Sequence, residues 1–500
     1  MKQLKLATLL LAGAVGLAAC SEDAPISPTA PEGPALAKQG ANKGENSYLV
    51  LAQGTALPAN LREQIQAAGG QLTSTTPEIG TALATSANPN FAKRAARIGG
   101  IRSVVPDLVI DWIEPPIVAE DNVGLDAIGN PPASGEDDFF FDLQWGHDAI
   151  DAPEAWNTSG EFGAGVRVCV IDSGIDADHP DLAPNINTEL SKSFVPGETP
   201  FTVPGFFFSH GTHVAGTIGA ADNGVGTIGV APEVELVSLR VFSDFGGGAP
   251  FSRINDAIVY AANIDCDIVN MSLSGSVPRS AGSAAAELIN SQRRATNYAF
   301  QQGVTLIASA GNGGLNRNKT RDLMVLPADL PHVVSVSAYG PEGWALDPFA
   351  PDAIFFVPAF YTNYGQRAID VSAPGGNVDF DLRASGQTCT IVLTRPCWVF
   401  DLVFSTIADG WGWTAGTSMA APHASGVAAL IIGQNGGEMK PSQVIAELQR
   451  TAEDVGKPGK DPFFGHGSVN AYFAVTGTPG TPVTRSPQGP GGRPGNGRGR

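Results

Sequence analysis

Short, almost wholly apolar runs rich in β-branched residues restrict the fold of this chain more than any other feature. They span residues 166–171 and 304–309. Runs of this length without polar alternation are typical of strands buried on both faces of a parallel sheet. Apolar residues recur at helical spacing after His210 and again after Ser418. The sequence therefore predicts an α/β fold with a mostly parallel central sheet.

Three polar residues stand at the ends of these predicted elements. Asp172 directly follows the run 166–171, at the carboxyl end of its strand, where open α/β sheets place functional groups. His210 opens its helix, and Ser418 lies in the first turn of an Ala-rich helix whose free N–H groups favour negative charge. A serine hydroxyl needs an imidazole to take its proton and a carboxylate to orient that imidazole. All three types are present.

Each of these three residues lies inside a recognisable run of five to eight residues. The runs read Val-Ile-Asp-Ser-Gly around Asp172, His-Gly-Thr-His-Val-Ala-Gly from His210, and Gly-Thr-Ser-Met-Ala-Ala-Pro-His around Ser418. Singly, an Asp after a strand or a Ser before a helix is usually a turn or cap residue. Together, and in the chain order Asp, His, Ser, the runs resemble the subtilisin-like serine proteases of the peptidase S8 family. The resemblance implies the subtilisin-like three-layer fold.

The same resemblance implies a role for each site residue. Ser418 would attack the scissile carbonyl, His210 would act as general base and then general acid, and Asp172 would orient the imidazolium. Asn312, in an Ala-Gly-Asn turn after the run 304–309, would donate its amide to the oxyanion. The substrate-binding residues implied by the family are Ser272, Leu273, Ser274, Ser309, Ala310 and Gly311. The family more often has Gly where this chain has Ser274.

Other motifs invite competing interpretations. His213 and His423 lie inside the catalytic runs, and we interpret both as packed structural residues. Residues 224–229 fit the dinucleotide fingerprint G-x-G-x-x-G, but they follow a helix and lead into a strand, which reverses the required order. His210 and His213 share a helix face, yet neither a His-Glu-x-x-His run nor a third ligand for zinc is evident.

Metal binding stays open at one acidic loop. Asp176, Asp178 and Asp181 surround His179 and form either a solvated turn or a calcium site. The resemblance implies that no cofactor is required for catalysis and that a structural Ca²⁺ ion is common in the family, but it assigns no metal ligands in this chain.

The amino terminus indicates export. Residues 1–19 resemble a secretory signal peptide, with Lys2 and Lys5 before an apolar stretch too short to span a membrane. The stretch ends in Leu-Ala-Ala-Cys, which resembles the bacterial lipoprotein signal and predicts lipidation of Cys20; ordinary cleavage with Cys20 incidental is the alternative. Residues 20–45 are rich in Pro, Ala, Gly and charge and predict a disordered tether.

Residues 46–112 predict a separate small domain. Strand and helix patterns alternate as βαββαβ, the ferredoxin-like arrangement, with a final strand over 101–112. The domain resembles the inhibitory I9-like propeptides of subtilisin-like proteases; an exported binding domain is the alternative. Residues 113–142 predict a linker with the maturation cleavage, 143–475 the catalytic domain, and 476–500 a disordered tail of Gly, Pro and Arg.

The cysteines fit an oxidising compartment. Cys389 and Cys397 flank a predicted hairpin, and a disulfide between them is expected there. Cys169 and Cys266 fall on two strands that the family fold places side by side, and we expect buried free thiols at both.

These patterns predict an exported serine endopeptidase made as an inhibited precursor. Its partners would be protein or peptide substrates and its own propeptide, with membrane contact only through the lipid of the precursor, and the enzyme would be a monomer. The net charge of −19 argues against nucleic acid as a partner. The competing functions are a catalytically inert binding protein of the same fold and a nucleotide-binding α/β enzyme, the latter suggested only by residues 224–229.

Overall fold

The computed structural model describes residues 46–112, 117–123, 136–202, 209–243, 248–348, 350 and 353–482, with the backbone alone for 117–123. The predictions for the signal segment, for Cys20 and for the tether lie outside the described residues. Within the described part of the chain, no helix has both the length and the apolar character needed to cross a bilayer.

The N-terminal unit forms the predicted small α+β domain. Its elements are β1 (Asn46–Ala52), α1 (Leu61–Ala68), β2 (Gln71–Thr76), β3 (Thr81–Ser86), α2 (Phe91–Ala95) and β4 (Ile101–Pro106). The strands lie in the order β2-β3-β1-β4, all antiparallel, which is the ferredoxin-like topology. Val50, Ile65 and Phe91 are fully buried between this sheet and its helices.

The prediction of a single final strand over 101–112 is wrong, because the structure has two strands in this stretch. β4 ends at Pro106, and β5 (Val109–Asp111) pairs instead with β10 (Gly248–Pro250), far along the chain. A proline has no N–H to continue a ladder. Beyond it, the buried carboxylate of Asp107 accepts the N–H of Ser252, 3.1 Å away, in the first turn of helix α6 (Phe251–Asn263). The chain therefore leaves the first sheet and joins the second domain.

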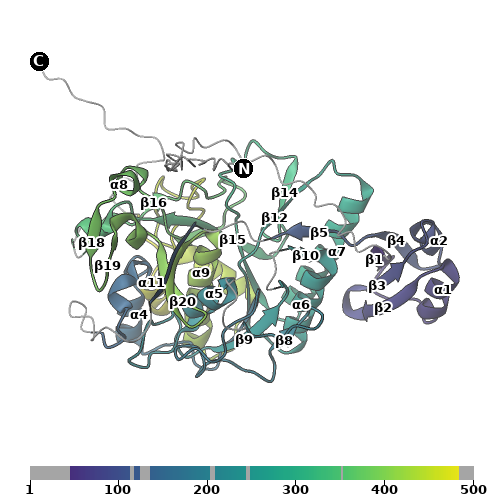
Figure 1. Cartoon of the computed structure of the whole chain (residues 1–500), viewed down its shortest axis with the longest axis horizontal. Coiled ribbons are helices and arrows are strands. Elements are labelled where there is room, and N and C mark those ends of the chain that lie inside the picture. Colours follow the sequence, from purple (N-terminus) through teal and green to yellow (C-terminus); the bar gives the residue numbers. More distant parts are fainter. Residues whose placement is uncertain are drawn as a thin grey trace, which may run out of the picture. The chain divides into compact units, whose positions relative to one another are not determined.

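The central sheet of the second domain is mostly parallel, as predicted (Figure 1). Its strands lie in the order β16-β15-β13-β11-β7-β9-β8, with β17 also paired to β15. All pairings are parallel except that of β15 with β16. In chain order these strands are β7 (Arg167–Asp172), β8 (Lys192–Ser193), β9 (Glu235–Arg240), β11 (Ile268–Met271), β13 (Thr305–Ser309), β15 (Val333–Gly340), β16 (Val357–Pro358) and β17 (Val371–Pro374).

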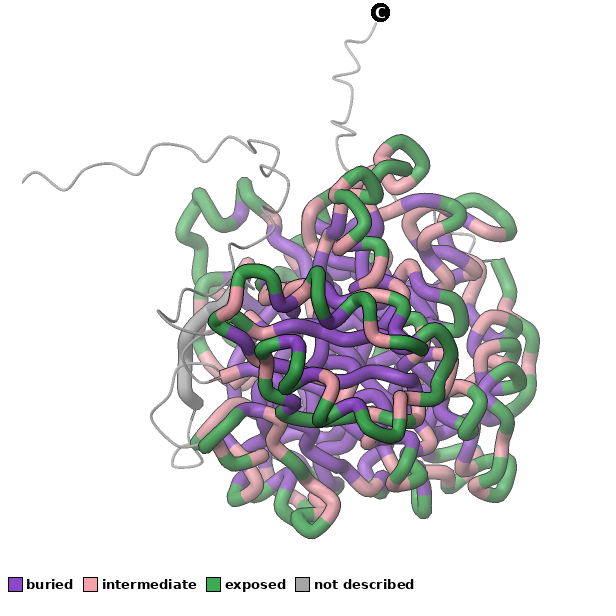
Figure 2. The backbone as a smooth tube through the Cα atoms, turned by 90° about the vertical axis from the view of Figure 1, so that its right-hand side faces the viewer, coloured by how far each residue is buried: buried purple, intermediate pink, exposed green. Residues whose placement is uncertain are grey.

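Helices cover both faces of this sheet and give three layers. Along β7, Val168 and Val170 belong to one buried cluster, with α5 (His210–Gly219) and α9 (Thr417–Gln434). Cys169 and Ile171 point into a second cluster, with α6 and α7 (Ser283–Gln301). This alternation is what a strand buried on both faces requires. In Figure 2 the buried stretches run through the interior, and the exposed ones lie mainly on loops and outer turns.

Further elements surround this framework. β20 (Val403–Ile407) and β21 (Gly410–Ala415) form a hairpin, and β6 (Ile117–Val123) adds to it along β21. A strand in the predicted linker is a difference from the sequence analysis, since 113–142 carries little periodic signal. The remaining elements are η1 (Pro77–Ile79), η3 (Phe141–Leu143), α3 (Trp145–Asp148), α4 (Ala152–Ser159), β12 (Gly275–Pro278), β14 (Leu323–Leu326), η4 (Trp344–Leu346), α8 (Phe380–Ser385), β18 (Thr388–Thr390), β19 (Thr394–Pro396), η5 (Cys397–Asp401), α10 (Pro441–Arg450) and α11 (Ala471–Thr476).

The described structure continues past the predicted domain end at Val475, to residue 482. Gly480 donates its N–H to the Arg450 carbonyl, and the N–H of Asp454 donates to the Thr481 carbonyl. These backbone contacts hold the start of the predicted tail against the end of α10.

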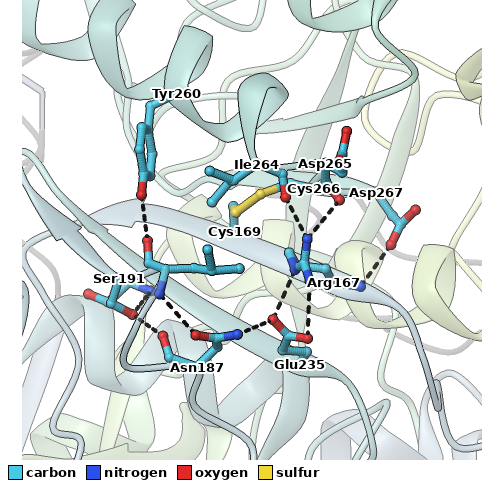
Figure 3. Close-up of a disulfide and its surroundings, with 12 residues drawn as sticks. Arg167, Cys169, Asn187, Ser191, Glu235, Tyr260, Ile264, Asp265, Cys266 and Asp267 are labelled. Carbon is cyan, nitrogen blue, oxygen red and sulfur yellow. Dashed lines mark hydrogen bonds and ion pairs between the residues drawn. A yellow bond between two sulfur atoms is a disulfide. The ribbon is translucent and has the colours of Figure 1, made fainter.

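The cysteines pair differently from the prediction at one site. Cys389 and Cys397 are joined across the β18–β19 hairpin. Cys169 and Cys266, expected as free thiols, also form a disulfide, so that expectation is wrong (Figure 3). Cys266 lies two residues before the start of β11, and β11 lies next to β7 with Ile268 opposite Val168. This register brings the two Cα atoms within 6.0 Å, a separation that a disulfide spans.

Candidate active site

Asp172 and His210 meet at the carboxyl edge of the central sheet. Asp172 is the last residue of β7 and His210 the first of α5. The imidazole Nδ1 lies 2.9 Å from each carboxylate oxygen of Asp172. Both residues are buried, with exposed fractions of 1% and 6%. A buried carboxylate at this distance fixes the ring orientation and directs Nε2 away from Asp172.

The residues that follow each of these two side chains hold the contact in place. The Ser173 N–H donates to Asp172 Oδ1 at 2.7 Å, and the Gly211 N–H donates to the Ser173 hydroxyl at 3.0 Å. Gly211 has no room for a side chain, because a Cβ there would lie 2.3 Å from the Gly174 carbonyl oxygen. The glycine that follows His210 is therefore needed for the close approach of α5 to the end of β7.

Ser418 is the second residue of α9 and is 6% exposed. Its hydroxyl donates to the Ser272 carbonyl at 3.2 Å, and the Ser272 hydroxyl donates to the Ser418 carbonyl at 2.7 Å. α9 packs against α5, the helix that begins with His210. Its first-turn N–H groups have no partner within the helix, so the backbone at Ser418 can donate to an anion.

Asn312 faces the same turn. Its side-chain carbonyl accepts the Thr417 N–H at 2.8 Å and the Thr417 hydroxyl at 2.7 Å. With Oδ1 engaged in this way, Nδ2 lies on the side of Gly416: a Cβ built there would be 3.3 Å from Nδ2 and 3.6 Å from the Ser418 nitrogen. The amide of Asn312 and the N–H of Ser418 thus converge on one small region of space.

The residues predicted to bind substrate line two sides of this region. Ser272, Leu273 and Ser274 follow β11, and Ser274 donates its N–H to the Trp112 carbonyl at 2.7 Å. Ser309 ends β13. Ala310 accepts the side-chain amide of Asn363 at 2.7 Å, and Gly311 donates its N–H to the Thr417 hydroxyl at 3.1 Å. The extended segment 109–112, which ends the N-terminal unit, therefore lies along the predicted substrate edge.

Sequence reasoning missed residues that support the site. Thr417 links the Asn312 turn to α9 through both its N–H and its hydroxyl. Asn270 donates to the Ser272 hydroxyl at 3.0 Å and accepts from Ser425 at 2.9 Å. Asn363 bridges Ala310 and the N–H of Leu315. Thr417 lies inside a quoted run, but no local signal marks Asn363, which becomes relevant only through the packing of distant segments.

Further histidines lie buried behind the site, consistent with our structural interpretation of His213 and His423. His213 Nε2 is 3.1 Å from the Val403 carbonyl oxygen, and His423 Nδ1 is 2.8 Å from that of Met419. The His147 ring lies 5.8 Å from that of His423. Burial lowers the pKa of His147 and of His213 to about 3 and that of His423 to about 4. All three are therefore neutral at pH 7.

We expect His147 to weaken the fold in acid. The pKa of folded His147 lies below the unfolded value of 6.5. The free energy of unfolding is therefore unaffected by this histidine above pH 6.5, and it decreases as the pH falls towards about 3. In a Ser418→Ala background, which prevents autolysis, we compare the free energy of unfolding of His147→Phe with that of the parent protein. The difference should shift in favour of His147→Phe by roughly 2–3 kcal/mol as the pH falls from 7.5 to 4.5. Urea unfolding at both pH values measures this, and an unchanged difference would contradict it.

Acidic side chains gather near the segment that follows the last residue of α5, Gly219. The side-chain oxygens of Glu136, Asp137, Asp138 and Asp222 lie within 4.8 Å of one another. Asp138 is buried and accepts the Gly224 and Val225 N–H groups. Burial, with the nearby Asp222 carboxylate, raises the pKa of Asp138 to about 7. Clustered carboxylates are the ligands that a hard cation such as Ca²⁺ takes.

The acidic loop singled out from the sequence is used differently. The carboxylate of Asp176 accepts the N–H groups of Asp178 and Asp409. That of Asp181 accepts the Thr227 N–H and the Trp411 Nε1–H. These carboxylates therefore cap turns inside the protein, and the acidic cluster around Asp138 is the better candidate for a metal. Residues 224–229 connect α5 to β9.

Comparison with known proteins places the chain in a family. The subtilase family (Peptidase_S8) model matches residues 163–467. Subtilisin BL from Lederbergia lenta is 34% identical over 337 residues, which are 67% of this chain and 98% of that protein. Subtilisin E from Bacillus subtilis strain 168 is 32% identical over 334 residues, 67% of this chain and 71% of that protein.

Solved structures resemble the fold over more of its length. The epidermin leader peptide processing serine protease from Staphylococcus aureus covers 87% of this chain and 98% of its own, with a TM-score of 0.67 and 21% identity. Fervidolysin from Fervidobacterium pennivorans, at 25% identity and a TM-score of 0.64, covers 86% of this chain and 61% of its own. The family match and the subtilisin identities together show that the chain belongs to the subtilase family and is a serine-type endopeptidase.

Proposed function

We propose that the protein cleaves peptide bonds with Ser418 as nucleophile, His210 as general base and then general acid, and Asp172 as the residue that orients the imidazole. The observation that carries this assignment is the contact between His210 Nδ1 and the buried Asp172 carboxylate. Asn312 and the Ser418 N–H would bind the oxyanion, and the acyl group would pass from Ser418 to water.

A fluorophosphonate probe tests this proposal directly, because such probes react with activated serine hydroxyls. The processed enzyme should be labelled, and a Ser418→Ala variant should not. The alternative of an inert binding protein with the same fold predicts no labelling of either form. Labelling at a serine other than Ser418, located by mass spectrometry of the tryptic peptides, would overturn the assignment.

Removing the amide of Asn312 should affect the transition state more than substrate binding. Asn312→Ala is expected to lower kcat about 10²- to 10³-fold with little change in KM, since the oxyanion forms only after attack. Steady-state kinetics on a peptide anilide measures both constants. Because Thr417 donates to Asn312, circular dichroism of the variant should confirm that the turn remains folded. A fall in kcat/KM carried by KM alone would argue against this role.

We further propose that residues 46–112 are an inhibitory propeptide. Support comes from β5, which pairs with β10, and from Trp112, whose carbonyl accepts the Ser274 N–H at the predicted substrate edge. Leu49, Ile79 and Val105 of the N-terminal unit also belong to the buried cluster that contains α6 and α7. A chain held in this way excludes substrate until it is cut. The mature amino terminus would then fall between Trp112 and Leu143.

Processing should also decide where the enzyme resides. Ser418→Ala should accumulate as the uncut precursor, whereas the wild type should yield a mature form whose first residue, read by Edman sequencing, lies in that interval. If Cys20 of the exported precursor carries a lipid, the cut separates the lipid from the catalytic domain. Mature enzyme that stays in washed membrane pellets would contradict release, and uncut wild type would contradict self-processing.

Structural calcium is proposed at the acidic cluster of Glu136, Asp137, Asp138 and Asp222, on the strength of its carboxylate donors. In the Ser418→Ala background, saturating Ca²⁺ at about 100 times Kd should stabilise the fold by about 2.7 kcal/mol, visible as a rise in Tm. Asp137→Asn/Asp222→Asn should abolish most of the rise. The same Ca²⁺ response in wild type and in this variant would place the ion elsewhere.

A further inference from the structure

An exposed apolar patch lies beside the candidate active site. Among the described residues, the large apolar side chains that are exposed are Leu346, Ile354, Phe360 and Phe380. Phe360 and Phe380 stack edge to face with ring centroids 5.0 Å apart, although 44% and 54% of their surfaces are exposed. Scattered exposed apolar residues are ordinary, but a contacting pair of exposed aromatic rings indicates a binding surface.

Leu346 lies near the helix that carries Phe380. A Cβ built on Gly343 would lie 3.3 Å from Leu346 Cδ1 and 3.8 Å from Leu382 Cδ2, so Leu346 approaches helix α8, which begins with Phe380. Leu346 is 55% exposed. We refer to Leu346, Phe360 and Phe380 as the apolar patch.

Hydrogen bonds fix the patch to the loops that carry the site. The residue after Phe360, Tyr361, accepts the Gly314 N–H at 2.6 Å, two residues beyond Asn312. Its hydroxyl lies 2.8 and 2.7 Å from the carbonyl oxygens of Gly375 and Gly376. The Gly416 N–H, two residues before Ser418, in turn donates to the Gly375 carbonyl at 2.9 Å. The residue next to Phe360 is therefore hydrogen-bonded to the loop after Asn312 and, through Gly375, is linked to the segment that precedes Ser418.

The course of the precursor chain gives a direction for a substrate that crosses Ser418. On the amino-terminal side of residues 113–142, the Trp112 carbonyl accepts the Ser274 N–H. Downstream, β6 runs antiparallel to β21, with Ile117 opposite Ala415 and Val123 opposite Trp411. A substrate that crosses Ser418 in the same direction places the residues after the cut along β21. Gly376 lies on that side, since a Cβ there would be 2.9 Å from the Ala415 Cβ.

We propose that the apolar patch binds a large apolar side chain of the substrate on the leaving-group side of the scissile bond. The enzyme then selects cleavage sites partly by the residues that follow the cut. This inference rests on the proposed function of Ser418. The occupant is a peptide segment whose backbone runs beside the β21 edge, where β6 lies in the precursor, and whose apolar side chain covers the two exposed rings.

The test compares two substrate types on processed enzyme made from the full chain. One is a set of internally quenched peptides, identical before the cut, with Phe or Ser at each of the first four positions after it. The other is a peptide p-nitroanilide, which has no residue after the cut. Wild type should prefer Phe at one or more of these positions by about tenfold in kcat/KM. Phe360→Ser/Phe380→Ser should lose most of that preference and keep its p-nitroanilide activity.

A conservative variant separates apolar contact from structure. Phe360→Leu/Phe380→Leu retains apolar surface and should keep most of the Phe preference. An undiminished preference in the serine variant, or no preference in wild type, would overturn the proposal. An equal loss on peptides and p-nitroanilide would also overturn it, because it would make the rings structural. Failure of the proposed function would look different, since neither substrate type would be cleaved and no fluorophosphonate label would appear.

Discussion

Replacing both Ser418 and His210 with alanine should cost no more activity than replacing either one alone. Each single substitution is expected to lower kcat by roughly 10⁵- to 10⁶-fold, because the hydroxyl is a poor nucleophile without its base and the base has no nucleophile to activate without the hydroxyl. Residues that act as one unit are strongly non-additive. Single-turnover hydrolysis of a peptide anilide by the three variants measures this.

The control for this cycle lies outside the proposed unit. Asn312→Ala removes the amide that stabilises a different charge, that of the oxyanion, so combining it with either substitution addresses a separate contribution. Variants must be processed by added wild-type enzyme, since none would be expected to cut itself. A double variant whose loss equalled the product of the single losses would mean that Ser418 and His210 act independently, against the proposed proton transfer.

Loss of the Cys169–Cys266 disulfide should destabilise the fold more than loss of the Cys389–Cys397 disulfide. Its cysteines are 97 positions apart, whereas Cys389 and Cys397 are 8 apart. On the chain-entropy model the long loop contributes about 4.7 kcal/mol and the short loop about 2.5 kcal/mol. Cys169→Ala/Cys266→Ala should therefore shift the urea midpoint by about twice as much as Cys389→Ala/Cys397→Ala.

Both pairs are to be measured in the Ser418→Ala background, with and without a reductant that reaches the unfolded chain. Refolding the Ser418→Ala protein under reducing conditions removes both crosslinks without changing a side chain, so its loss should approach the sum of the losses of the two cysteine variants. Equal losses for the two cysteine pairs, or a larger loss for the hairpin pair, would contradict loop closure as the main contribution.

The sequence predicted the parts of the fold that depend on local patterns. The run 166–171 appears as β7, displaced by one residue, and His210 and Ser418 lie in the first turns of their helices as expected. These elements are specified by unbroken apolar character or by helical spacing, which the chain carries locally. The succession of strands and helices in the N-terminal unit followed for the same reason, and its match to the ferredoxin-like arrangement predicted the order of the strands in the sheet.

What could not be predicted depends on contacts between distant segments. Pro106 is a local signal for the end of a strand. The pairing of β5 with β10 has no such signal, because short strands acquire partners only in the folded chain. Cys169 and Cys266 looked like buried thiols until the register of β11 on β7 brought them together. Asn363 supports the site from a segment with no motif.

The β5 and β6 segments belong to the same chain as Ser418; β5 pairs with β10, and β6 pairs with β21, the strand that ends three residues before Ser418. On the proposed processing route, the first bond cut is therefore supplied by the molecule that cuts it. Such a step is first order in protein, so its half-time stays constant on dilution. A single exported molecule, with no neighbour and no free substrate, could still become active.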